Sequence, residues 1–396
     1  MRTVTASAGR SPWRRRLLVL FVLVAVVSLA GCSLLFGSGD DSTSLPTGDQ
    51  AAEQYLSMDG YEATVHYEYS DQPDRRALLQ VDVDGGNSRI AWLAPVRLAG
   101  NVQTYNGSTT VRYNATRNEY VSISTSNIDN FEDGAERIAD AVDAARDDGT
   151  ATVDQPPSGG APLPVVPEGN AADAATSDRY EVTYDGTEQV AGREAHVIGY
   201  EPVENVTDGV LEQTVWVDTE YFITLKSHSV SRYDGDRSTF TFRLSNVSIA
   251  PGLSERDFSF DPPANATLNA SDSYDVTGYD TRAQLVTVAA IGVPDPAVPE
   301  RFALSRATHI VGQNFTAIQL QYQTSSSRLF VTKTSEQTYT DLTEGERVTI
   351  GNETGRYRTS QTRAIVVWRC GGYVYTVTGG VEKGTLLDVA RSIECS

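Results

Sequence analysis

Apolar and polar residues alternate along much of the first two thirds of the chain, which is the period-two pattern of β-strands with one buried face. In the run 61–69, Tyr, Ala and Val at odd positions alternate with Glu, Thr and His. Turn dipeptides separate such runs, Asn106-Gly107 being the strongest hairpin signal, and further turns are predicted at 185–186 and 192–193. The remaining predicted strands are 77–83, 89–93, 102–105, 109–113, 120–124, 180–184, 195–200, 211–217, 222–233, 237–247 and 257–260.

A helical pattern interrupts the strands at about 131–146, where apolar residues recur on one stripe. The stripe consists of Phe131, Ala135, Ile138, Val142 and Ala145. A shorter helix is predicted at about 51–58. Roughly ten antiparallel strands in local order form a sheet that twists and curls. A helix packed inside the curve would bury its apolar face.

The last third of the chain predicts a second, smaller α+β domain over 275–396. Its predicted strands are 318–322, 329–332, 347–350, 364–368 and 373–377, and its final helix is 386–393. Five prolines fall within residues 149–177 of the first domain. This stretch is either a loop that covers the mouth of a cavity or a disordered insertion.

The first 31 residues have the features of a secretory signal. Three arginines at 14–16 precede the uncharged run 17–31, which is too short for a comfortable membrane span. Small residues before Cys32 resemble a lipobox, which implies a lipid-modified cysteine at the mature N-terminus. Arg14-Arg15-Arg16-Leu17-Leu18 resembles a twin-arginine export signal. The alternative is an uncleaved N-terminal anchor, and both place the chain outside the cytoplasmic membrane.

Residues 32–50 are rich in Gly, Ser and Asp, and we interpret them as a flexible tether. The predicted organisation is therefore a signal over 1–31, a tether over 32–50 and a first domain over 51–263, followed by the second domain. The predicted location is the outer face of the cytoplasmic membrane, with the membrane as a partner through the lipid on Cys32.

The charge balance is strongly acidic, with 52 Asp and Glu against 32 Lys and Arg, a net charge of −20. This balance argues against nucleic-acid binding, which needs a basic face. It also opposes adsorption to an anionic membrane. Only three of the basic residues are lysine, and an acid-rich, lysine-poor chain fits a salt-rich habitat, where repulsion is screened. The alternatives are thus a halophilic source and an ordinary acidic secreted protein.

The remaining two cysteines, Cys370 and Cys395, predict one disulfide in an exported protein, the alternative being two unpaired thiols. Asn-x-Ser/Thr sequons are more frequent than chance predicts, which indicates a glycosylated surface. The candidate glycosylation sites are Asn106, Asn114, Asn205, Asn246, Asn265, Asn269, Asn314 and Asn352.

The sequence contains no recognisable catalytic motif. The four histidines lack metal-ligand spacing, and neither a nucleophile elbow nor a phosphate-binding glycine loop occurs. His66 and His196 are predicted on the solvated faces of their strands. We therefore predict no enzyme activity, no catalytic residue, no metal and no cofactor.

Four segments in order resemble the LolA/RseB-like family. They are Asn101–Asn114, Tyr184–Val197, the hairpin with Val215-Trp216-Val217-Asp218 and Leu225-Lys226, and Phe258–Pro263. The resemblance implies an unclosed antiparallel half-barrel with helices packed on its concave side, within an α+β, β-dominated chain. It also implies binding of lipoprotein acyl chains or similar amphiphiles. Val366-Val367-Trp368, Cys370, Tyr375–Gly379 and the last helix resemble a small domain of unknown function that occurs in exported and anti-sigma-type proteins.

Two functions follow as the main hypotheses, and an enzyme that acts on esters or glycans is a third, less favoured class. The first is a membrane-anchored surface lipoprotein that binds a lipid-like or lipoprotein acyl ligand in a concave apolar groove. The second is an envelope sensor that binds a membrane-protein partner and holds no ligand. The candidate lining residues, which a packed core would equally explain, are Val65, Tyr67, Trp92, Tyr105, Tyr113 and Trp216.

Overall fold

A computed structural model of the chain describes residues 45–127, 130–147, 152–153, 180–203, 209–233, 235–324, 327–335, 345–360 and 363–395. The described residues belong to one compact unit, 45–396. The predicted signal, Cys32 and most of the tether lie outside the described residues, as does nearly all of the proline-rich stretch. Within the described ranges, no helix is long and apolar enough to cross a membrane.

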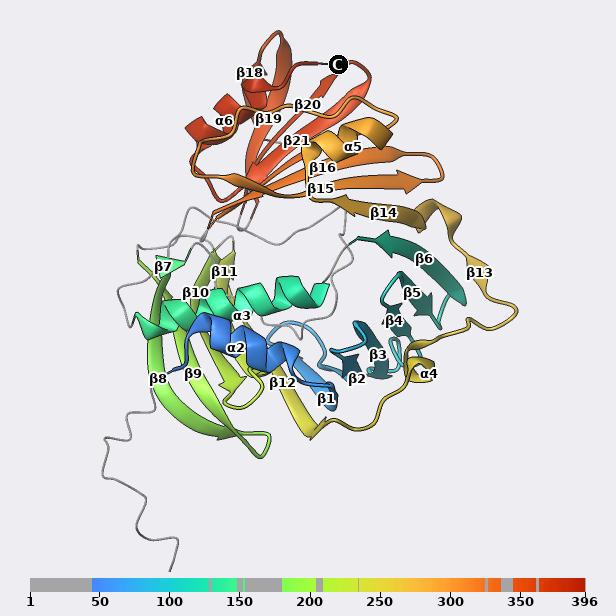
Figure 1. Ribbon diagram of the computed structural model, residues 1–396, viewed down its shortest axis with the longest axis vertical. Coiled ribbons are helices and arrows are strands. Elements are labelled where there is room, and N and C mark those ends of the chain that lie inside the picture. Colours follow the sequence, from blue (N-terminus) through green and yellow to red (C-terminus); the bar gives the residue numbers. More distant parts are fainter. Residues whose placement is uncertain are drawn as a thin grey trace, which may run out of the picture. The chain divides into compact units, whose positions relative to one another are not determined.

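The fold is α+β and dominated by strands. Strands β1 to β12 form a curled, unclosed sheet, here called the N-terminal sheet, in the order β7–β8–β9–β10–β11–β12–β1–β2–β3–β4–β5–β6, with every neighbouring pair antiparallel (Figure 1). The bounds are β1 Gly60–Tyr69, β2 Arg75–Asp82, β3 Asn87–Ala94, β4 Val102–Asn106, β5 Thr109–Asn114, β6 Glu119–Ser126, β7 Thr152–Val153, β8 Tyr180–Val190, β9 Arg193–Pro202, β10 Gly209–Asp218, β11 Thr224–Tyr233 and β12 Asp236–Ile249.

Two helices, α2 (Gly48–Leu56) and α3 (Asn130–Arg146), pack inside the curve of this sheet (Figure 1). Helix α2 begins at a capping box, in which the Thr47 hydroxyl accepts from the Gln50 amide and the Gln50 side chain accepts from the Thr47 amide. The predicted apolar stripe of α3 faces the sheet. Its residues Phe131 and Ala135 join one buried cluster with β1 and β2, and Val142 and Ala145 join another with β8 to β10. The helix prediction is confirmed.

Two local predictions were wrong. The predicted strand 257–260 is instead the short helix α4 (Glu255–Phe258). Its first turn is fixed because the Asp257 carboxylate accepts from the amide and the hydroxyl of Ser254. The predicted turn at 185–186 is a bulge within a continuous β8, since the pairing with β9 shifts register between Tyr184 and Thr187. Gly186 supplies the positive φ of 90° at the bulge.

Strands β14 to β21 form a second region, here called the C-terminal sheet, in the order β14–β15–β16–β17–β21–β20–β19–β18. Helices α5 and α6 contribute Leu285, Leu386 and Ala390 to its core, around the fully buried Trp368. Cys370 and Cys395 form a disulfide with their Cα atoms 5.7 Å apart. The bounds are β14 Tyr274–Tyr279, α5 Arg282–Val288, β15 Ala303–Gly312, β16 Thr316–Gln323, β17 Arg328–Thr334, β18 Glu346–Ile350, β19 Glu353–Ser360, β20 Arg363–Cys370, β21 Tyr373–Gly379 and α6 Lys383–Ser392.

The two sheets are continuous through β14. This strand pairs in parallel with β6 of the N-terminal sheet and antiparallel with β15 of the C-terminal sheet. Before it, β13 (Thr267–Leu268) also pairs with β6, and the 3₁₀ helix Ala270–Asp272 leads into β14. The sequence pattern did not predict β14, β15 or β19.

Candidate functional site

The concave face of the N-terminal sheet is defined by the odd-numbered residues of β1. Directly paired residues on antiparallel strands point to the same face, so Val65 shares its face with Ala77 of β2 and Leu244 of β12. Tyr61, Ala63 and Val65 are at most 1% exposed and belong to the cluster that α2 and α3 complete. Val65, a predicted lining residue, is therefore part of a packed core.

Burial weakens along β1 toward its end, where Tyr67 and Tyr69 are only half-buried. Around them lies a group of aromatic side chains on the same face, here called the aromatic cluster. The Tyr67 ring lies 5.6 Å from that of Trp92 and 6.3 Å from that of Phe240, and the Tyr69 ring lies 5.1 Å from that of Phe240. Phe242, 5.8 Å from Tyr67, joins the cluster to the buried core. The predicted lining residues Tyr67 and Trp92 thus come together.

The aromatic cluster has one cation at its border. The Arg75 guanidinium lies 4.9 Å from the centre of the Tyr69 ring, a cation–π geometry. Burial raises the pKa of Tyr67 to about 12 and also raises the pKa of Tyr69. Both phenols are therefore neutral at physiological pH, and the surface combines apolar rings with two neutral hydroxyls and one positive charge.

Tyr105, another predicted lining residue, lies on the concave face but serves the fold. Tyr105 pairs with Ser88 of β3, and Ser88 pairs with Val81 of β2. Val81 in turn pairs with Tyr61, so all four residues lie on the concave face. The Tyr105 side chain is 4% exposed, and its hydroxyl donates to the Gly107 carbonyl over 2.9 Å, which closes the β4–β5 hairpin. It is separate from the aromatic cluster described above.

The predicted lining by Tyr113 was wrong, because the register places it on the convex face. Tyr113 pairs with Val102, Val102 with Ala91, and Ala91 with Leu78, which pairs with Thr64. Thr64 is an even-numbered residue of β1, opposite the concave face. There the Tyr113 ring lies 5.4 Å from that of Phe260, just after α4.

The register also places Trp216 on the convex face, although its side chain, 9% exposed, belongs to the same buried cluster as Val65. Trp216 pairs with Lys226, Lys226 with Arg243, and Arg243 with His66, all on the convex face. The Lys226 ammonium lies 3.7 Å from the centre of the indole ring, and the indole N–H donates to Glu188 over 2.6 Å. These contacts cover Trp216 on that face.

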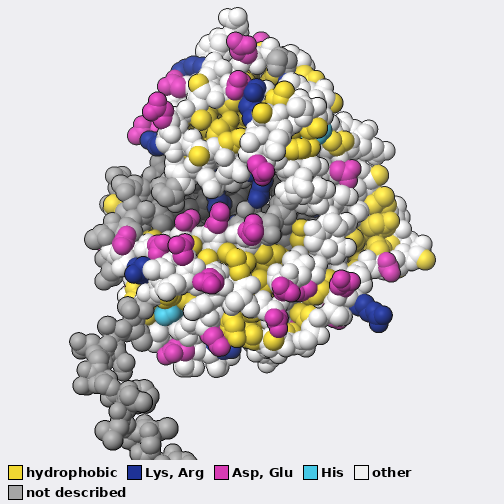
Figure 2. Space-filling view, in the orientation of Figure 1, with side chains coloured by type: hydrophobic (Ala, Val, Ile, Leu, Met, Phe, Trp, Pro, Cys, Tyr) yellow, Lys and Arg dark blue, Asp and Glu magenta, His cyan; other side chains and the backbone are white. Residues whose placement is uncertain are grey.

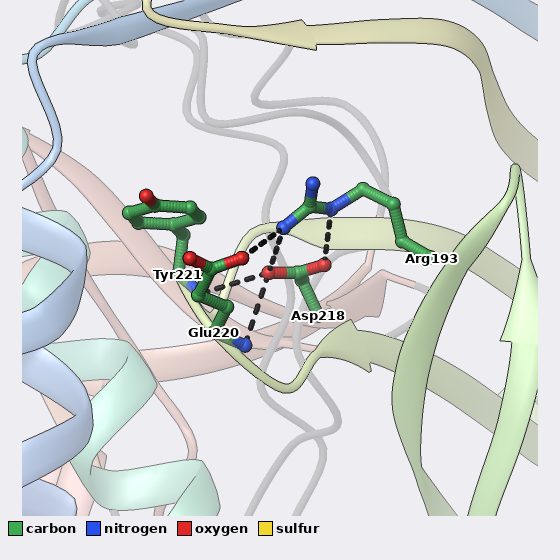
Figure 3. Close-up of polar contacts among 4 residues, drawn as sticks. All are labelled: Arg193, Asp218, Glu220 and Tyr221. Carbon is green, nitrogen blue, oxygen red and sulfur yellow. Dashed lines mark hydrogen bonds and ion pairs between the residues drawn. The ribbon is translucent and has the colours of Figure 1, made fainter. Parts of the chain in front are cut away.

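The turn between β10 and β11 is held by a buried carboxylate. Asp218, 1% exposed, binds the Arg193 guanidinium over 2.5 and 3.1 Å, and its Oδ1 accepts from the backbone amides of Glu220 and Tyr221 (Figure 3). Glu220 adds a more exposed contact of 3.0 Å to Arg193. The hydrogen bond to Asp218 is the main cause that raises the pKa of Arg193. The cluster therefore clamps the hairpin, with the two carboxylates sharing the one guanidinium.

The prediction of a solvated His196 was wrong. His196 shares its face with Ile198 and Tyr200 and is 7% exposed. Its Nδ1 lies 3.1 Å from the Tyr184 hydroxyl, and its ring stacks on Phe222 at 5.8 Å. His66 is partly buried, with its Nε2 2.8 Å from the Ser245 hydroxyl.

Burial gives the protein an expected sensitivity to acid. Desolvation lowers the pKa of His196, and also that of His66 and His309. The unfolded chain therefore binds protons first as the pH falls below about 6.5, so stability rises with pH in that range. When the pH is lowered from about 7 to about 5, we expect the denaturant concentration at the unfolding midpoint to decrease. The decrease should be smaller in His196→Gln. An unchanged pH profile in that variant would contradict a buried neutral imidazole.

The described sequons differ in exposure. Asn106, Asn246, Asn265, Asn314 and Asn352 are exposed, whereas Asn114 and Asn269 are half-buried and Asn205 lies outside the described residues. Glycosylation at these positions stays a prediction. In the described parts of the chain, no three His, Cys, Asp or Glu side chains are grouped so as to hold a metal.

Comparison with known families identifies two domains. Residues 133–255 match the MucB/RseB N-terminal domain, and residues 295–393 match a domain of unknown function (DUF4367). The first match shows that residues 133–255 are similar to the MucB/RseB N-terminal domain, and neither match covers half of the chain. No curated protein matches the chain.

Solved structures with a similar course of the chain include the Pseudomonas aeruginosa MucA/MucB complex. It is 15% identical and has a TM-score of 0.40, covering 88% of this chain and 99% of that one. A LolA superfamily protein from Nitrosomonas europaea is 12% identical, with a TM-score of 0.24 and coverages of 55% and 99%. A lipoprotein-sorting protein domain from Vibrio parahaemolyticus is 14% identical, with a TM-score of 0.25 and coverages of 54% and 96%.

Proposed function

We propose that this protein binds a lipid-like ligand, such as the acyl chain of a lipoprotein, at the aromatic cluster on the concave face. The protein would act outside the cytoplasmic membrane, held there by the lipid on Cys32. The observation that carries the proposal is the half-buried group of Tyr67, Tyr69, Trp92 and Phe240. It lies on the same face as the buried residues of β1 that pack with α2 and α3. The MucB/RseB domain match supports a carrier or regulatory role rather than catalysis.

The chemistry of the aromatic cluster suits an amphiphile. Rings arranged at 5 to 6 Å offer a large apolar contact area with little rotamer freedom to lose. Acyl chains have no hydrogen-bonding groups, so they suit the apolar rings, while the two phenol hydroxyls must keep water as their partner at the edge of the cluster. Arg75 at the border would pair with an anionic head group.

Intrinsic fluorescence tests the proposal with a single-chain lysophospholipid as the probe. In residues 45–396, which exclude Trp13, Trp216 and Trp368 are at most 9% exposed. A blue shift on titration should therefore come from half-buried Trp92 and vanish in Trp92→Phe. Phe240→Ser should weaken binding about tenfold by removing a ring contact. The matched control is Tyr113→Ser, an aromatic residue of similar burial on the convex face, which should bind like wild type.

Two results would overturn this assignment. One is equal affinity of Phe240→Ser and wild type, and the other is a loss of affinity in Tyr113→Ser of the same size. Native mass spectrometry of protein extracted with its own lipids should also show a bound amphiphile, and a uniformly empty protein counts against the proposal.

The second candidate is an envelope sensor that binds a membrane-protein partner. The match over 133–255 to the MucB/RseB domain favours it, together with the C-terminal domain of unknown function. In a solved structure MucB is in complex with MucA. Crosslinking in intact cells separates the candidates, because a sensor should give one discrete membrane-protein adduct whether or not Phe240→Ser is present.

A further inference from the structure

The convex face of the N-terminal sheet carries a row of basic side chains across four neighbouring strands, here called the basic row. Arg76 of β2 pairs with His66 of β1, and His66 pairs with Arg243 of β12. Arg243 in turn pairs with Lys226 of β11. Directly paired residues on antiparallel strands point to the same face, with Cβ atoms about 4.5 to 5.5 Å apart. The four side chains therefore lie side by side.

The basic row is unusual in a chain of this composition. The chain has 52 acidic against 32 basic residues, and lysine occurs at only three positions. Like charges at directly paired positions destabilise a sheet. With acidic residues in such excess, a basic side chain is expected to have an acidic neighbour. Basic side chains in direct register on four strands therefore call for another source of negative charge.

Acidic side chains of the protein neutralise the basic row only weakly. Glu68 lies 3.3 Å from Arg243, but the side chains are 47% and 42% exposed, and ion pairs of this kind contribute little. The exposed Arg76 side chain makes no hydrogen bond or ion pair with any residue that the structure describes. The Lys226 ammonium lies 3.7 Å from the centre of the Trp216 ring rather than beside a carboxylate.

His66 lies between the two arginines and responds to their charge. Its Nε2 is 2.8 Å from the Ser245 hydroxyl, whereas its Nδ1 has no hydrogen-bond partner in the described part of the chain. Desolvation lowers the pKa of His66, and the charges of Arg243 and Arg76 lower it further. Of the charged groups that act on this ring, only Glu68 raises the pKa. The positive charge at the centre of the basic row is thus incompletely compensated.

We propose that the basic row binds a tetrahedral dianion, the phosphate group of a small soluble ester, above His66. A phosphate group carries up to two negative charges and three strong acceptor oxygens, so it can contact several cations at once. Neighbouring strands are about 4.8 Å apart, so the long side chains of Arg76 and Arg243 can both reach an anion over the ring between them. A carboxylate has a single charge and would neutralise only one of these cations.

The charge of the whole chain separates a soluble ester from a lipid head group. A net charge of −20 opposes approach to an anionic membrane, whereas a small anion can enter a local positive field. The aromatic cluster lies on the opposite face of the sheet. The anion site therefore stands or fails independently of ligand binding at that cluster.

Titration of residues 45–396 with inorganic phosphate, in place of chloride at constant ionic strength, tests the proposal. His66 is one of four histidines, so NMR can follow its ring resonance, which His66→Gln identifies. Bound phosphate should shift this resonance to saturation and raise the pKa of His66, because a nearby negative charge favours the imidazolium. Arg76→Gln and Arg243→Gln should each weaken phosphate binding about tenfold, the effect of losing one charge-assisted hydrogen bond.

Arg237→Gln is the matched control. Arg237 is exposed, lies on the same face of β12 six residues before Arg243 and pairs with Arg232, so the variant removes the same charge outside the basic row. It should bind phosphate like wild type. Equal losses of affinity in Arg237→Gln and Arg243→Gln would show a general attraction of charge and overturn the site. A His66 resonance that phosphate shifts no more than chloride does would overturn it as well.

Discussion

Replacing Asp218 by Ala should lower the free energy of unfolding by about 3 kcal/mol, because it leaves the Arg193 guanidinium without its main partner. Asp218 is 1% exposed and Arg193 22% exposed in its side chain, so water replaces the lost contact poorly. The variant also removes the acceptor of the Glu220 and Tyr221 amides, which hold the turn. The measurement is the shift of the urea midpoint at constant slope.

Glu220→Ala is the matched control for this clamp. Glu220 binds the same guanidinium over 3.0 Å, but its side chain is 64% exposed, and exposed ion pairs contribute at most about 1 kcal/mol. If the two substitutions lower the free energy of unfolding equally, burial does not explain the contribution of Asp218 to stability. Asp218→Asn should fall between them, since the amide keeps one acceptor for the turn but loses the charge.

The sequence predicted the elements whose signals are local. The alternation over 61–69 gave β1 its concave face, and the stripe from Phe131 to Ala145 gave α3 the side that packs on the sheet. Asn106-Gly107 lies at the predicted hairpin, where Gly107 has a φ of 80°. Each of these features is decided within one strand, one helix or one turn, so the pattern of residues is sufficient.

The candidate site depends on which strands are neighbours, and that information is not local. Trp92 and Phe240 are almost 150 residues apart, yet both rings flank Tyr67 because β1 pairs with β2 and β12. Tyr113 and Trp216 are aromatic residues in alternating strands, as Tyr67 and Trp92 are. Following the pairing from strand to strand back to β1, however, places both of them on the convex face. A one-residue change in register reverses the face of a strand.

The sequence pattern did not predict the strand that links the two sheets, for a related reason. β14 is a six-residue strand with glycine at its fifth position, in which only Val276 and Gly278 are buried, and it pairs in parallel with β6. Parallel pairing joins segments distant in sequence and leaves no turn signal between them. Asp218 is likewise an ordinary strand end in the sequence, and only the fold brings Arg193 to it.

Trp368→Ala should lower the free energy of unfolding by about 3 to 5 kcal/mol, the range for truncating a fully buried large aromatic residue. Trp368 is 0% exposed in the core of the C-terminal sheet, and its ring stacks on Tyr375 at 5.3 Å with 15° between the planes. Alanine would leave a cavity that β20 cannot close, because β19 and β21 hold this strand on both sides.

Trp92→Ala is the control for Trp368→Ala, because it removes the same indole from a less buried position. The same atoms are removed from a half-buried position, so the free energy of unfolding should fall by only about 1 to 2 kcal/mol. Urea unfolding followed by near-ultraviolet circular dichroism measures both variants. In a chain whose sheets are continuous through β14, Trp368→Ala should also lower the midpoint reported by the N-terminal sheet. If that midpoint is unchanged, the two sheets unfold independently and the β14 pairing does not couple them.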